Sequence, residues 1–126
     1  MKSLQFKYSF ILIFSIIISC QYDKPDNLIV SFANEENIDL DLYNKITIIP
    51  AEGCRQCILE KKNNADDSIL YVLTGSTLNN SKAILNYFSK DVSIVIDKNN
   101  LFSKNELVST NPVNFIKKDN QFIKQN

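Results

Sequence analysis

Two cysteines with the spacing C-x-x-C, Cys54 and Cys57, are the residues most suited to chemistry in this chain. They follow an apolar, β-branched run at 46–49 that stops at Pro50, and a helix-forming segment comes after them. At a helix N-terminus the first N–H groups lack internal partners and the helix dipole favours negative charge, so a cysteine there ionises readily to the reactive thiolate. The spacing therefore predicts a dithiol site in which Cys57 closes a disulfide with Cys54.

Zinc sites use the same C-x-x-C spacing, and a structural site needs four ligands, mostly Cys or His. The chain has no histidine, and its remaining cysteine, Cys20, has a separate explanation below. We therefore favour disulfide chemistry, with no metal and no cofactor, over metal binding. Asp39 and Asp41 alternate with apolar residues and could suggest a second metal site, but the alternation is more typical of a solvated strand face.

Residues 1–19 have the pattern of an export signal. Lys2 and Lys7 form a positive n-region, and the apolar run at 10–18 is shorter than the about 20 apolar residues of a membrane span. The run ends in Ile17-Ile18-Ser19-Cys20, which resembles the bacterial lipobox. The resemblance implies that Cys20 is lipidated and becomes the mature N-terminus. The alternative is an uncleaved signal anchor in which Cys20 is incidental.

A lipidated Cys20 would anchor the protein to a membrane of the bacterial cell envelope, outside the cytoplasm, where disulfides persist. Gln21, the next residue, carries no charge, which favours the outer membrane facing the periplasm if the cell is Gram-negative. The export signal and the C-x-x-C therefore support each other.

The 126 residues are enough for one domain, and the formal net charge is zero. Removal of Lys2 and Lys7 with the signal would leave 12 basic and 14 acidic residues, a net charge of −2. A nucleic-acid-binding surface would show clustered Lys and Arg with a strongly basic balance, so nucleic acid is not an expected partner.

The hydrophobic pattern predicts strands that alternate with helices, which indicates an α/β domain over 28–126 after a lipidated Cys20 and polar tether at 20–27. The predicted strands are 28–32, 38–42 (an edge strand), 46–49, 69–73 and 92–96, followed by a hairpin at 113–116 and 121–124. The predicted helices are 55–64, a helix capped by Ser76 or Thr77 that extends to Phe88, and one or two turns at 101–107.

Three motifs between about Lys45 and Gln125 carry a resemblance to the thioredoxin-like superfamily, and most closely to its membrane-tethered extracytoplasmic thiol–disulfide oxidoreductases. They are Ile48-Ile-Pro-Ala-Glu-Gly-Cys54-Arg-Gln-Cys57, Val95-Ile-Asp97-Lys-Asn-Asn-Leu-Phe102 and Thr110-Asn-Pro112-Val-Asn-Phe-Ile-Lys-Lys-Asp119. The resemblance implies a central mixed β-sheet flanked by helices, with a C-terminal β-hairpin. Because the chain ends at Asn126, we expect the family's usual C-terminal helix to be missing.

The resemblance also implies roles for individual residues. Cys54 would be the attacking thiol and Cys57 the resolving thiol. Pro112 would be a cis-proline that faces them, and Asn111 would offer its backbone to an extended substrate. The chain departs from the family in having no tryptophan, with Ala51-Glu52-Gly53 before the first cysteine. Glu52 should raise the pKa of Cys54, against the helix dipole and Arg55.

Two functions follow from these features. In the first, the protein is an anchored thiol–disulfide oxidoreductase whose partners are protein thiols or disulfides. In the second, it is a non-catalytic lipoprotein of thioredoxin-like fold, in which the disulfide is only a structural staple and the surface binds a partner.

Overall fold

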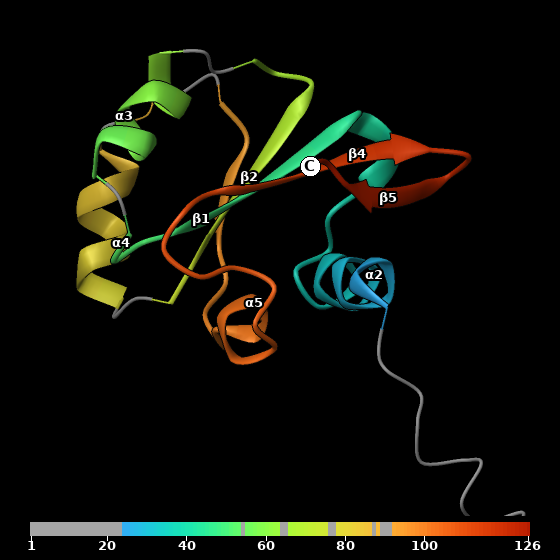
Figure 1. Ribbon diagram of the computed structural model, residues 1–126, viewed down its shortest axis with the longest axis horizontal. Helices are drawn as coiled ribbons and strands as arrows, with labels where there is room; N and C mark the ends of the chain where they lie inside the picture. Colours follow the sequence, from blue (N-terminus) through green and yellow to red (C-terminus); the bar gives the residue numbers. More distant parts are fainter. Residues whose placement is uncertain (1–23, 54, 64–65, 76–77, 87, 89–91) are drawn as a thin grey trace, which may run out of the picture.

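The computed structural model describes residues 24–53, 55–63, 66–75, 78–86, 88 and 92–126. They form an α/β domain with a mixed five-stranded sheet in the order β3-β2-β1-β4-β5 (Figure 1). The elements in chain order are α2 (Pro25–Glu35), the 3₁₀ turn η1 (Leu40–Leu42), β1 (Lys45–Pro50), α3 (Arg55–Asn63), β2 (Ile69–Thr74), α4 (Leu78–Leu85), β3 (Ile94–Ile96), α5 (Leu101–Lys104), β4 (Val113–Lys118) and β5 (Gln121–Lys124).

The central strand β1 is parallel to β2 and antiparallel to β4. β3 extends the parallel side beyond β2, and β5 closes the other side as the second strand of a hairpin with β4. Five consecutive residues of β1 and five of β2 are buried, which confirms the prediction that continuous apolar runs form strands covered on both faces.

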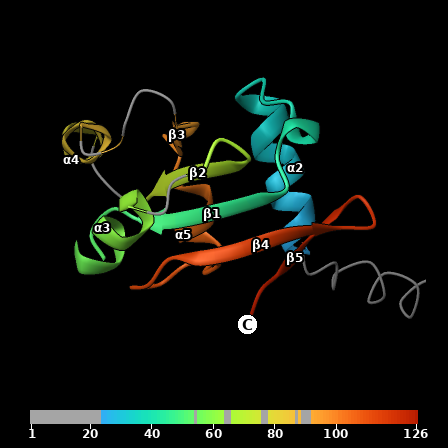
Figure 2. The ribbon, with the colours of Figure 1, turned by 90° about the horizontal axis from the view of Figure 1, so that it is seen from above.

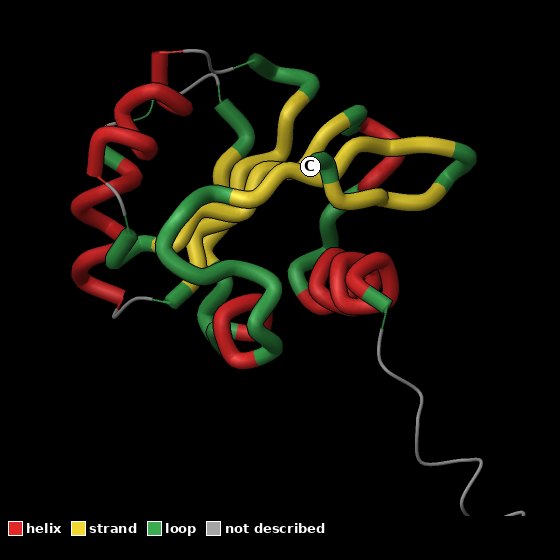
Figure 3. The backbone as a smooth tube through the Cα atoms, viewed as in Figure 1, coloured by secondary structure: helices red, strands yellow, loops and turns green. Residues whose placement is uncertain are grey.

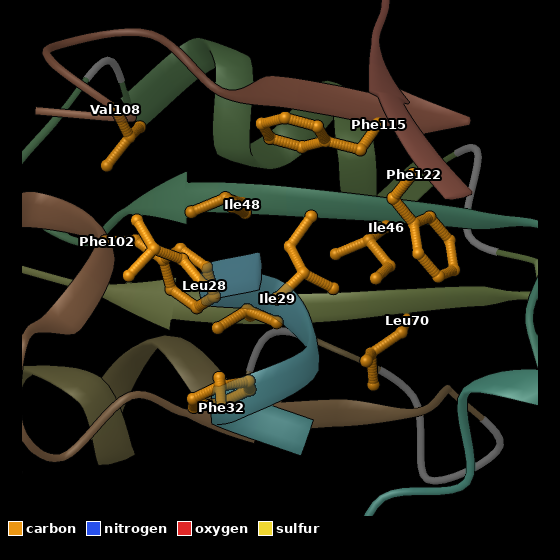
Figure 4. Packing of buried hydrophobic residues seen from close by; sticks show 11 residues of the cluster. Leu28, Ile29, Phe32, Ile46, Ile48, Leu70, Phe102, Val108, Phe115 and Phe122 are labelled. Atoms are coloured by element: carbon orange, nitrogen blue, oxygen red, sulfur yellow. The ribbon is translucent and has the colours of Figure 1, made fainter. Parts of the chain in front are cut away.

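Helices cover both faces of the sheet: α3 and α4 lie on one, α2 and α5 on the other (Figure 3). On the α2/α5 face the core contains Ile29 and Phe32 of α2, packed over Ile48 of β1 together with Phe102 and Phe115 (Figure 4). On the α4 face a second core joins Ile49 of β1 and Tyr71 and Leu73 of β2 to Phe88, with Ile84 and Leu85 of α4 packed against it.

The segment 28–32 forms part of helix α2, so the prediction of a strand there is wrong. Pro25 occupies the first turn, where its fixed φ suits a helix, and the helix buries Leu28, Ile29, Phe32 and Ala33. This spacing is the buried stripe of a helix, because a strand would bury alternate residues. α2 begins within the segment that we expected to be a polar tether.

The segment 38–42 also differs from the prediction, because it contains the turn η1 and no edge strand. Asp39 caps this turn: its Oδ1 accepts the Asp41 N–H at 3.0 Å. Such local bonds compete with strand pairing. Asp41 in turn pairs with Lys117 of β4, whose Nζ lies 2.7 Å from the Asp41 Oδ1.

Several later elements are shorter than predicted. β3 begins at Ile94, two residues after the predicted start at Val92, and α5 is one of the one or two predicted turns but ends at Lys104, before the predicted end at Leu107. α4 ends at Leu85, so Phe88 lies beyond it, although its side chain is buried. The proposed caps of α4, Ser76 and Thr77, lie outside the described residues. The C-terminal hairpin is confirmed, although β4 extends two residues beyond the predicted end at Ile116, and the two residues between the strands have positive φ.

Asp97 directly follows β3 and is buried. Its carboxylate links the end of β2 to the first turn of α5. Its Oδ2 accepts the hydroxyl of Thr74 at 2.7 Å and the N–H of Phe102 at 3.0 Å. Asn100, the N-cap residue of α5, uses its side chain elsewhere, accepting the Gly75 N–H at 2.9 Å. Asp97 therefore satisfies a first-turn N–H that the cap residue leaves free.

No helix in the described part of the chain is both long and apolar enough to cross a membrane.

A pair of substitutions in α2 tests the helical assignment, because the helix buries the side chain of Ile29 and exposes that of Val30. Ile29→Ala should lower the free energy of unfolding by about 2–5 kcal/mol, since it opens a cavity in the core. Val30→Ala, at the next residue, should change it by less than about 0.5 kcal/mol because Val30 is exposed in the helix. Urea denaturation would measure both, and a larger loss at Val30 would contradict the assignment.

Candidate active site

The candidate site begins at the C-terminal end of the central strand β1, where the chain makes a tight turn. The Gly53 N–H donates to the carbonyl oxygen of Pro50 at 3.0 Å, which closes the turn. The Ala51 N–H donates at 2.9 Å to the carbonyl oxygen of Thr74, at the end of β2. Hydrogen bonds to the ends of β1 and β2 therefore hold the turn in place. The next helix, α3, begins at Arg55.

Cys57 lies in the first turn of α3, is half-buried, and is disulfide-bonded. The chain contains two other cysteines, Cys20 and Cys54, and both lie outside the described residues. The structure thus brings one member of the predicted pair to the N-terminus of a helix, directly after the central strand. The position of Cys54, and the opposing effects of Glu52 and Arg55 on its pKa, stay predictions.

A second segment, distant in sequence, lies against this turn and helix. The Oδ1 of Asn111 is 4.0 Å from the Sγ of Cys57. A Cβ added to Gly53 would collide with the carbonyl oxygen of Thr110 and would lie 2.6 Å from Cγ of Pro50. The close approach of the two backbones therefore requires glycine at position 53. The sequence prediction placed Asn111 near the cysteines, but it missed the contact between Gly53 and Thr110.

The side chain of Asn111 adds a chemical possibility to the backbone role that we predicted for it. A disulfide sulfur carries no hydrogen, so the contact with Cys57 is not a hydrogen bond in the oxidised protein. After reduction, the Cys57 thiol can donate its weak S–H to the Asn111 Oδ1. The amide can also turn to offer its N–H₂ group to a thiolate. Asn111 is therefore placed to orient the Cys57 sulfur.

The bond between Asn111 and Pro112 is trans, because the described residues contain no cis peptide bond. The prediction of a cis-proline is therefore wrong. Pro112 directly precedes β4, where its missing N–H removes no hydrogen bond from inside the strand. The trans form of an X–Pro bond is also the more stable by about 0.5–1 kcal/mol in the absence of other constraints.

A polar pair joins the two strands that lead into the site. The hydroxyl of Thr47 on β1 donates to the Oδ1 of Asn114 on β4 at 2.9 Å, and Thr47 is almost completely buried. The two residues face each other in the β1–β4 register. Their bond satisfies a buried hydroxyl and fixes β4 beside β1 only a few residues after Asn111.

The described residues contain no group of three or more His, Cys, Asp or Glu side chains that could hold a metal ion. The two acids that suggested a metal in the sequence have other partners. Asp39 caps η1, and Lys117 lowers the pKa of Asp41 by its hydrogen bond and its charge.

No family model, no curated protein and no solved structure matches this chain.

Replacing Gly53 by alanine tests the packing between the β1–α3 turn and Thr110. The added methyl group must push two backbone segments apart, so Gly53→Ala should lower the free energy of unfolding by about 1–3 kcal/mol. Glu52→Ala is the matched control, and we expect a change below about 0.5 kcal/mol because Glu52 is exposed. Equal unfolding free energies for the two variants would show that the close contact does not form.

Proposed function

We propose that this protein is a membrane-anchored, extracytoplasmic thiol–disulfide oxidoreductase in which Cys54 and Cys57 form the redox-active pair. The main support is the position of Cys57: a disulfide-bonded cysteine in the first turn of the helix after the central strand, 4.0 Å from Asn111. A sulfur at a helix start, beside a side chain that can hydrogen-bond to it, suits thiol exchange.

We also propose that the domain is thioredoxin-like. In favour of this, the C-x-x-C helix follows the central strand, two further parallel strands lie on one side, and an antiparallel hairpin lies on the other. The segment before β4 also packs against the start of α3, where the resemblance places the family's substrate-binding residues. The trans bond before Pro112 is the main departure.

The proposed reaction moves two electrons between the dithiol and a protein disulfide. The Cys54 thiolate attacks one sulfur of the substrate disulfide, so a mixed disulfide forms and one substrate thiolate leaves. The Cys57 thiol then loses its proton and attacks the Cys54 sulfur. This step forms the Cys54–Cys57 disulfide and releases the second substrate thiolate. The substrate disulfide is thereby reduced to two thiols and the dithiol is oxidised, and the reverse sequence oxidises a substrate.

A specific observation favours a second candidate function, a non-catalytic binding module. The trans bond at Pro112 differs from the geometry that the resemblance implies for the oxidoreductases. In this function, the disulfide of Cys57 only stabilises the start of α3. The protein would be the same lipoprotein, with a surface that binds a partner.

Trapping a reaction intermediate distinguishes the two functions. Cys57→Ser should accumulate a mixed disulfide with protein substrates, because the thiol that resolves it is gone. Cys54→Ser is the matched control: it keeps one thiol of the pair but should form no adduct. Non-reducing gels and mass spectrometry of the envelope proteins measure both. An adduct of Cys54→Ser and none of Cys57→Ser would reverse the two roles, and no adduct from either would favour the binding module.

The anchor is tested separately at Cys20. Cys20→Ser should abolish incorporation of labelled fatty acid and should leave the signal segment attached, because the lipid-modified cysteine defines the cleavage site in the lipobox pattern. Mass spectrometry of the purified chain measures both effects. A Cys20→Ser protein that is cleaved at the same place without lipid would contradict the lipoprotein proposal.

A further inference from the structure

One face of the C-terminal hairpin carries exposed apolar side chains. Ile116 of β4 and Ile123 of β5 are directly opposite in the hairpin register and are 38% and 47% exposed. Their neighbours Phe115 and Phe122 point to the other face and are buried in the core. We call the face that bears Ile116, Lys118 and Ile123 the hairpin surface.

Two lysines lie near this apolar pair. Lys118 is exposed on the hairpin surface, and Lys45 of β1 lies opposite Ile116. Asp119, in the hairpin turn, is an acidic neighbour. The hairpin surface therefore combines two exposed isoleucines with Lys118, and Lys45 lies beside them.

The first described residues lie beside this hairpin. The Oδ1 of Asp26, in the first turn of α2, accepts the Phe122 N–H of β5 at 2.8 Å. Figure 2 shows the start of α2 next to β5. The contact occupies a donor on the open edge of the sheet, and such cover hinders the addition of another strand there. It also fixes the point from which the N-terminal segment leaves the domain.

The length of that segment limits how far the domain can move from a lipid on Cys20. Only residues 21–24 separate Cys20 from Pro25. Even when fully extended, the five Cα–Cα steps from Cys20 to Pro25 span at most about 18 Å. A lipidated Cys20 would therefore hold Pro25, at the start of α2, within this distance of the membrane, and β5 contacts the same turn of α2 through Asp26.

We propose that the hairpin surface docks on an anionic phospholipid bilayer, with Ile116 and Ile123 in the headgroup region and Lys45 and Lys118 against lipid phosphates. The inference rests on the proposed lipidation of Cys20. Apolar side chains flanked by Lys are the pattern of segments that lie in a membrane interface.

Tryptophan fluorescence can test this contact in the full lipidated chain, which contains no natural tryptophan. Ile123→Trp would be reconstituted in vesicles of phosphatidylethanolamine and phosphatidylglycerol, with and without acyl chains brominated near the headgroup. We expect blue-shifted emission and a loss of about half or more of the intensity in brominated vesicles, because a docked side chain enters the interface. Ile116→Trp should behave in the same way and guards against misfolding of a single variant.

Val30→Trp is the matched control, since Val30 is 42% exposed but lies on α2, which covers the other face of the sheet. It should keep a solvent-like spectrum with little quenching. Mass spectrometry first establishes whether Cys20 carries lipid; an unlipidated chain overturns both the anchor and this inference. In a lipidated chain, quenching no stronger at 116 and 123 than at 30 overturns the docking alone. Blue-shifted emission without quenching would indicate contact with a second copy and would also overturn it.

Discussion

The antiparallel pairing of β1 with β4 is the constraint on which the candidate site depends. The register runs from Lys45 opposite Ile116 to Ile48 opposite Val113, and the buried bond from Thr47 to Asn114 lies within it. Because β4 begins opposite the end of β1, the residues just before it must lie beside the β1–α3 turn. This brings Asn111 to Cys57, 54 residues away in sequence, and Thr110 to Gly53. The Thr47–Asn114 bond helps to fix this register, because a one-residue slip would move the two side chains to opposite faces and leave the buried Thr47 hydroxyl without its partner.

The elements that were predictable from sequence are those whose hydrophobic pattern and length fit only one type of secondary structure. The buried runs at Ile46–Ile49 and Ile69–Leu73 are too short for typical helices and are rich in β-branched residues, so they indicated strands. The run Leu28-Ile-Val-Ser-Phe32 has similar composition but forms a helix, because the sheet already has its strands and needs cover on one face. The helical signals lie mainly outside those five residues, in Pro25 at the helix start and in Ala33, which completes the buried stripe.

The candidate site was predictable to a similar extent. The C-x-x-C spacing indicated a disulfide at the start of a helix, and Cys57 is found there in a disulfide. The position of Asn111 near the cysteines followed only from the resemblance. The contact between Gly53 and Thr110 depends on how closely two backbones approach, which sequence spacing does not encode. The trans bond at Pro112 shows that a motif match does not specify backbone geometry.

The reduction potential of the cysteine pair tests the central proposal most directly. It can be measured by equilibrating the purified protein with glutathione or dithiothreitol buffers and alkylating the free thiols. A thiol–disulfide oxidoreductase should give a potential above about −300 mV, because its disulfide must exchange readily with those of other proteins. A potential below about −300 mV would indicate a stable structural disulfide and would contradict the proposed activity.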